Sequence, residues 1–132
     1  MAKILLIDDD EDLRLSIKAV LMTTGHECEE AGSAVEGIQR LAEVKPDLVI
    51  LDVMMEDQVA GFRVVNAMRD FDNDPQARQW EKVPILMLTS VQQVTRTRFE
   101  QDAGTPLLPV DCFVEKPIKP TALLAKVKEL LA

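Results

Sequence analysis

Polar side chains follow four short apolar runs of the sequence, and their types suit metal and phosphate chemistry. The runs are residues 4–7, 48–51, 85–88 and 112–114, and the polar residues after them are Asp8, Asp9, Asp52, Thr89 and Lys116. Carboxylate oxygens are preferred ligands of Mg²⁺. A lysine ammonium and a threonine hydroxyl donate hydrogen bonds to phosphoryl oxygens. If the runs end at one edge of a sheet, these residues form a site for a cation and a phosphoryl group.

The three carboxylates make such a site costly without a cation. Placed together, Asp8, Asp9 and Asp52 repel by about 4 kcal/mol per pair at a separation of ~4 Å and an effective dielectric constant of ~20. Such a cluster must take up protons, hold a cation or spread apart. Mg²⁺ meets this need and keeps several water ligands that an oxyanion replaces. The residues therefore predict a Mg²⁺–phosphoryl site built on Asp52.

The apolar runs predict the buried strands that position this site. They are apolar at every position, which is typical of parallel strands covered by helices on both faces. Residues 26–31 alternate with acidic side chains and predict a fifth strand at a half-exposed edge. Strand and helix then alternate five times along one domain, residues 1–132, which favours a doubly wound α/β fold with strand order 2-1-3-4-5. Ligands bind such sheets at the carboxyl ends of the strands, where the strand order reverses.

Helical spacing fills the segments between the strands. The predicted helices are one through Leu13, Ile17 and Leu21 that closes at Gly25, one capped by Ser33 and Glu36, one after Gly61, a weakly anchored one over residues 92–102, and a last one with Pro120 in its first turn. Residues 10–12 are all acidic and are predicted to favour the first helix's N-terminus rather than to bind metal. Residues 71–83 and 105–111 form longer connections, and both local packing and a partner surface stay open for them.

Composition narrows the function classes. The chain has 132 residues, 47% of them hydrophobic and 29% charged, which is typical of a soluble globular domain. Its net charge of −8 argues against direct nucleic-acid binding, which needs clustered Lys and Arg. No apolar run reaches the roughly 18 residues of a membrane span, and the start of the chain lacks a signal-peptide pattern. The prediction is a cytoplasmic protein with no membrane partner, in which Cys28 and Cys112 are reduced thiols.

The same residues resemble the receiver domains of two-component signalling, including the stand-alone chemotaxis-type regulators. The resemblance rests on Asp8-Asp9, Asp52, Thr89 followed by a small residue, and Lys116-Pro117, and it covers the whole chain. It implies a flavodoxin-like three-layer sandwich and a role in phosphorelay signalling. Asp52 would accept a phosphoryl group from a sensor histidine kinase and so switch a face that binds a protein target. Such a domain assists its own phosphorylation and dephosphorylation but is not a turnover enzyme.

The resemblance also assigns the remaining roles. It implies that Mg²⁺ is bound by Asp8, Asp9, Asp52 and the backbone carbonyl of Met54, and that Thr89 and Lys116 contact the phosphoryl group. Thr89 and Phe113 match the switch pair, in which Phe113 turns inward as Thr89 moves toward the phosphoryl group. The bond between Lys116 and Pro117 matches the family's cis peptide. A monomer is expected, and dimerisation on phosphorylation stays open.

Two other functions stay open. A receiver-like module that is never phosphorylated would use the same fold purely for protein interaction. Residues 7–10 also match the first motif of a small aspartate-dependent phosphohydrolase of the haloacid-dehalogenase kind. That family needs a second acidic pair after a later strand, and none follows Thr89.

Overall fold

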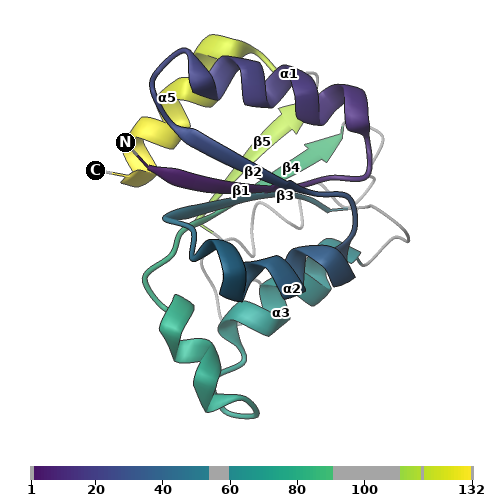
Figure 1. The fold of residues 1–132 in the computed structure, drawn as a ribbon, viewed down its shortest axis with the longest axis vertical. Coiled ribbons are helices and arrows are strands. Elements are labelled where there is room, and N and C mark those ends of the chain that lie inside the picture. The colour runs from purple at the N-terminus through teal and green to yellow at the C-terminus, as the bar shows by residue number, and fades with distance from the viewer. Residues whose placement is uncertain (1, 54–59, 91–110, 117, 132) are drawn as a thin grey trace.

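Five parallel strands form the sheet that the sequence predicts, in the order β2-β1-β3-β4-β5 (Figure 1). The strands are β1 (Lys3–Ile7), β2 (Glu27–Ala31), β3 (Leu48–Asp52), β4 (Ile85–Ser90) and β5 (Cys112–Lys116). The computed structural model describes residues 2–53, 60–90, 111–116 and 118–131. The predicted helix over residues 92–102, Met54 and Pro117 therefore lie outside the described residues.

Helices cover both faces of the sheet and make the predicted three-layer sandwich (Figure 1). Helices α1 (Glu11–Met22) and α5 (Pro120–Leu131) lie on one face, and α2 (Ala34–Val44) and α3 (Ala60–Arg69) on the other. Alternate residues of β1 supply two separate cores. Ile4 and Leu6 pack with α1 and α5, whereas Leu5 and Ile7 pack with α2 and α3. This two-sided burial is why the central strands are apolar at every position.

The parallel register brings the functional strand ends level with one another. Ile7 pairs with Leu51 and Asp52 pairs with Leu88. Asp8 follows Ile7 just as Asp52 follows Leu51, so the two carboxylates leave neighbouring strands at the same height. This is the point between β1 and β3 where the strand order reverses, as the sequence predicts.

The helix ends follow the predicted capping signals with small differences. The Asp10 side chain caps α1, and Ser33 Oγ accepts the Glu36 N–H at 3.1 Å. The Glu36 carboxylate accepts the N–H of Gly32 at 3.1 Å, one residue upstream of its partner in the capping-box motif. Helix α1 ends at Met22, and Gly25 takes a positive φ of 82° in the following turn.

Gly61 lies inside α3 rather than before it, because that helix begins at Ala60, two residues earlier than predicted. Its N–H donates to the carbonyl of Val53 at 2.9 Å. A Cβ at this position would meet the Val53 backbone at 2.8 Å and would also clash with the Asp52 carbonyl. The close approach of two backbones therefore requires glycine beside the end of β3.

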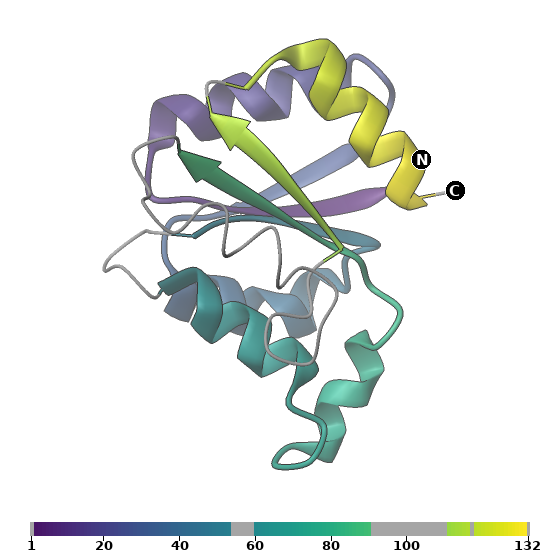
Figure 2. The same cartoon turned by 180° about the vertical axis from the view of Figure 1, so that it is seen from behind.

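The connection over residues 71–83 packs locally through a short 3₁₀ helix, η1 (Pro75–Trp80), which projects at one end of the molecule (Figure 2). The Arg69 guanidinium donates to the carbonyls of Trp80 and Val83 at 2.6 and 2.5 Å. Trp80 and Val83 pack against the core on the α2–α3 face. Arg69 thereby anchors this connection to the end of α3. Most of the other long connection, residues 105–111, lies outside the described residues.

Candidate functional site

Three carboxylates converge at the carboxyl ends of β1 and β3. Among the described residues, one oxygen each from Asp8, Asp9 and Asp52 lies within 4.8 Å of the others. Asp8 is fully buried and Asp52 is 5% exposed, whereas Asp9 faces solvent. Mutual repulsion of buried carboxylates is strong because little water screens it. The cluster therefore has the composition and spacing of a site for a hard divalent cation.

Lys116 supplies the positive charge of the site. Its Nζ lies 2.7 Å from Asp52 Oδ2 and 3.8 Å from Asp8 Oδ2. Because β5 is two strands away from β3, the lysine side chain reaches across the end of β4 to make these contacts. Burial disfavours the ammonium, but the hydrogen bond and charge of Asp52 outweigh it and raise the pKa of Lys116. Lys116 is therefore a fixed cation beside the Asp52 carboxylate.

Two buried oxygens of the site lack hydrogen-bond partners within the described part of the chain: Asp8 Oδ2 and Thr89 Oγ1. Thr89 is 1% exposed and follows Leu88, the register partner of Asp52. A buried polar atom without a partner costs about 1–3 kcal/mol, so such atoms are rare in folded proteins. These two atoms suit a site that a ligand completes, with a hydroxyl donor on one side and a carboxylate acceptor on the other.

The loop between β1 and α1 holds Asp8 in place. The backbone N–H of Asp8 donates to the carbonyl of Ala31 at 3.1 Å. Asp8 Oδ1 accepts the N–H of Asp10 at 3.0 Å, and Asp10 Oδ1 in turn accepts the N–H of Leu13 at 3.2 Å. Asp10 therefore serves the helix N-terminus, as predicted. Asp8 Oδ2 is left as the carboxylate oxygen that faces Lys116.

Burial raises the pKa of the Asp8 carboxyl from 3.8 to about 6. The Asp10 N–H and Lys116 oppose this shift, and the charges of Asp52 and Asp9 add to it. The folded protein therefore binds this proton more tightly than the unfolded chain does. Between these two pKa values stability falls as pH rises, and it is regained as pH falls through 6.

We expect the free energy of unfolding in EDTA to rise as the pH is lowered from about 7 to about 5, by at most about 1.4 kcal/mol per pH unit from Asp8. Urea denaturation of the wild type and of Asp8→Asn at each pH measures this free energy of unfolding. The difference between the two proteins isolates Asp8. Glu30 does not titrate within this pH range. Burial raises the pKa of its carboxyl, but hydrogen bonds from Lys18 and Arg14 outweigh burial and lower it. Parallel pH profiles for the two proteins would contradict the assignment.

The structure brings together most of the predicted site residues. Asp8, Asp9, Asp52 and Lys116 lie in one cluster, and Thr89 is the next-to-last residue of β4, the strand between β3 and β5. Phe113 is partly buried against the core on the α2–α3 face. Met54 and Pro117 lie outside the described residues, so the predicted carbonyl ligand and cis peptide stay predictions.

The single histidine of the sequence and its two cysteines lie outside the carboxylate cluster. Nδ1 of His26 accepts the N–H of Ala2 at 3.3 Å, at the opposite end of the sheet. Cys28 and Cys112 lie in β2 and β5, the two edge strands, and both thiols are free. None of the helices in the described ranges is long and apolar enough to cross a membrane.

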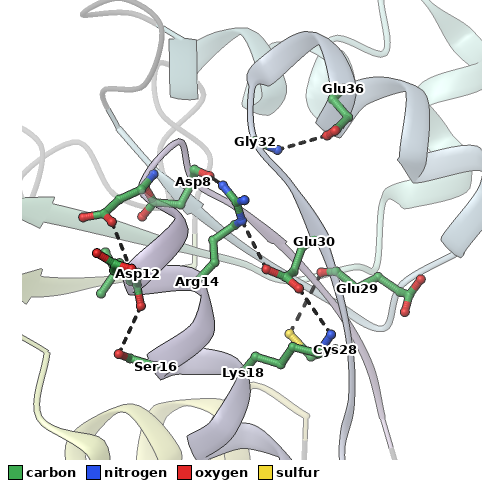
Figure 3. Close-up of polar contacts among 12 residues, drawn as sticks. Asp8, Asp12, Arg14, Ser16, Lys18, Cys28, Glu29, Glu30, Gly32 and Glu36 are labelled. Atoms are coloured by element: carbon green, nitrogen blue, oxygen red, sulfur yellow. Dashed lines mark hydrogen bonds and ion pairs between the residues drawn. The ribbon is translucent and has the colours of Figure 1, made fainter.

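Arg14 also contacts the site, a role that was not predicted from the sequence: its Nη1 donates to the backbone carbonyl of Asp8 at 2.5 Å (Figure 3). One signal was available. Arg14 is the first basic residue after the acidic run over residues 8–12 and lies in the first turn of the predicted helix. Side chains of a helix point toward its N-terminus, which here is the acidic loop.

Comparison with known proteins agrees with this geometry. Residues 4–128 match the sequence model of the response regulator receiver domain. The chain is 33% identical over 129 residues to response regulator MprA of Mycobacterium leprae (strain TN), covering 98% of this chain and 50% of that protein. The chain thus spans half the length of the curated relatives it matches.

Solved structures share the fold over the whole chain. Chemotaxis response regulator CheY4 of Vibrio cholerae superposes with a TM-score of 0.81 at 28% identity, covering 99% of each chain. The receiver domain of NtrX from Brucella abortus has a TM-score of 0.76 at 22% identity over 97% of each chain, which speaks to the fold alone.

Proposed function

The chain belongs to the response regulator receiver domain family, and we propose that it accepts a phosphoryl group on Asp52 in a Mg²⁺-dependent reaction. The observation that carries the proposal is the buried Asp52 carboxylate held 2.7 Å from Lys116 within a cluster of three acids. A structural ion pair alone would not need the two further carboxylates. The family as a whole works in phosphorelay signalling, and the proposal gives this chain the acceptor's part.

The donor set fits Mg²⁺. Asp8, Asp9 and Asp52 offer oxygen ligands, which this cation prefers, and Asp8 Oδ2 is a buried acceptor without a hydrogen-bond partner among the described residues. The Met54 carbonyl completes the proposed ligand set. When bound, Mg²⁺ supplies positive charge that offsets the carboxylates and the phosphoryl oxygens.

The residues of the chain then act mainly by position and charge. A carboxylate oxygen of Asp52 forms a bond to phosphorus as the bond between phosphorus and the donor's leaving atom breaks, and the leaving group departs with that electron pair. Lys116 neutralises charge on the phosphoryl oxygens. The Thr89 hydroxyl, which lacks a hydrogen-bond partner among the described residues, donates to one of them.

We further propose the signalling context. The donor is a sensor histidine kinase, and the output is a protein target that binds a switched face. Movement of Thr89 toward the phosphoryl group would free space for Phe113, which lies in the neighbouring strand opposite Met87. The domain over residues 1–132 works in the cytoplasm as a phosphoacceptor rather than a turnover enzyme, and as a monomer before phosphorylation.

The test is phosphorylation of the purified chain by acetyl phosphate, followed by intact-protein mass spectrometry. We expect one phosphoryl group per chain with Mg²⁺ and none after EDTA treatment, because the carboxylate cluster repels an incoming anion without the cation. Absence of phosphorylation with Mg²⁺ would favour the unphosphorylated interaction module. Steady hydrolysis of a generic phosphomonoester would favour the phosphohydrolase.

A further inference from the structure

Arg14 lies outside the carboxylate cluster, but its guanidinium holds the loop that carries two of the carboxylates. We propose that Arg14 is a positioning residue that sets the affinity of the Asp8–Asp9 loop for a divalent cation. The inference rests on the proposed function, since it concerns the same cation site. Among the described residues, the hydrogen bonds of this side chain go to a backbone carbonyl and to Glu30 rather than to the carboxylate oxygens of the cluster.

The Arg14 side chain spans two elements with two separate donors (Figure 3). Nη1 donates to the carbonyl of Asp8 at 2.5 Å, and Nε pairs with Glu30 Oε1 on β2 at 3.2 Å. The side chain is only 17% exposed, so its contacts are better shielded from water than those of a surface pair. A planar guanidinium makes both bonds at once in a fixed geometry, which a lysine ammonium on a flexible stem does not reproduce.

Glu30 is a rigid anchor for this contact. Its second carboxylate oxygen pairs with Lys18 Nζ at 3.2 Å, and its backbone carbonyl accepts Arg40 Nη1 from α2 at 2.7 Å. Glu30 on β2 thereby fixes the Arg14 guanidinium, and the guanidinium in turn fixes the Asp8 carbonyl in the loop after β1.

The carbonyl that Arg14 holds belongs to the peptide unit joining Asp8 to Asp9. A peptide unit is planar and rigid, so fixing its oxygen also fixes the nitrogen and Cα of Asp9. The N–H of Asp8 is already bound by Ala31. Without Arg14 this peptide could rotate, and the exposed Asp9 would lose its fixed position relative to Asp52.

Positioning and simple electrostatics predict opposite effects on Mg²⁺ affinity. Arg14 is a cation near the site, so its charge by itself weakens the binding of another cation. If charge alone mattered, removal of the charge would tighten Mg²⁺ binding and Arg14→Lys would change nothing. If positioning matters, both substitutions weaken binding.

The experiment is isothermal titration of Mg²⁺ into the full chain for the wild type, Arg14→Gln, Arg14→Lys and the control Lys18→Gln. We expect the dissociation constant to rise about tenfold in both Arg14 variants, as for other residues that orient metal ligands. Lys18 contacts the same Glu30 but not the loop, and its side chain is 36% exposed. Its substitution should change the constant by less than about twofold.

Thermal unfolding in EDTA checks that each variant is folded, and Arg14→Lys keeps the charge beside Glu30 if Arg14→Gln is unstable. Tighter Mg²⁺ binding by Arg14→Gln, or unchanged binding by Arg14→Lys, would overturn the inference. Equal weakening in Lys18→Gln would overturn it too, because the effect would then belong to the charge network in general. Failure of the wild type to bind Mg²⁺ would instead overturn the proposed function itself, and this inference with it.

Discussion

Asp52→Asn is expected to fold like the wild type and to accept no phosphoryl group. An asparagine amide has the shape of the carboxylate, and its oxygen still accepts the hydrogen bond that Lys116 donates to Asp52 at 2.7 Å. An amide is not a competent nucleophile toward phosphorus. Phosphoryl incorporation from acetyl phosphate with Mg²⁺ should therefore fall from one group per chain to none, which intact-protein mass spectrometry measures directly.

The matched control for this substitution lies at the other end of β3. Asp47 immediately precedes this strand and accepts the N–H of Lys3 at 2.9 Å, far from the cluster. Asp47→Asn makes the same chemical change and should keep full incorporation. Far-UV circular dichroism and urea denaturation would establish that both variants are folded. Stoichiometric phosphorylation of Asp52→Asn at a single site would show that the acceptor is another residue.

Lys116→Met is expected to destabilise the folded protein in EDTA by about 2–3 kcal/mol at neutral pH, because it removes the partner of two buried carboxylates. Asp8 and Asp52 would then face each other without the ammonium that lies 3.8 and 2.7 Å from them. The figure is kept below that for a fully buried pair because the lysine side chain is 25% exposed. Urea denaturation gives the free energy of unfolding.

Added Mg²⁺ should reduce the difference between Lys116→Met and the wild type. A cation that binds the folded state stabilises it, and a carboxylate cluster without its lysine should gain more from that cation. Lys126→Met is the matched control, because Lys126 lies on α5 in an exposed pair with Glu129 at 3.7 Å. Its loss should be less than about 0.5 kcal/mol. An equally small loss for both variants would mean that Lys116 is not the main counter-charge of the cluster.

The sheet and the site were accessible from the sequence because they depend on short-range patterns. Strands buried on both faces must be apolar throughout, and parallel strands must end at a common edge. A polar residue that directly follows an apolar run must therefore lie at this edge of the sheet. On this basis Asp8, Asp52 and Thr89 could be predicted to lie close together. The N-terminal caps by Asp10 and Ser33 were predictable for the same reason, since capping needs only near neighbours.

Only the tertiary structure decided which partners the long side chains choose. Lys116 Nζ lies nearer to Asp52 than to Asp8. Arg14 on α1 contacts both the Asp8 carbonyl after β1 and the Glu30 side chain on β2. The Arg69 guanidinium likewise donates hydrogen bonds to two backbone carbonyls of the connection over residues 71–83. Long flexible side chains reach several elements, and packing of the whole chain determines which acceptor lies within reach. Sequence periodicity therefore does not predict which acceptor such a side chain contacts.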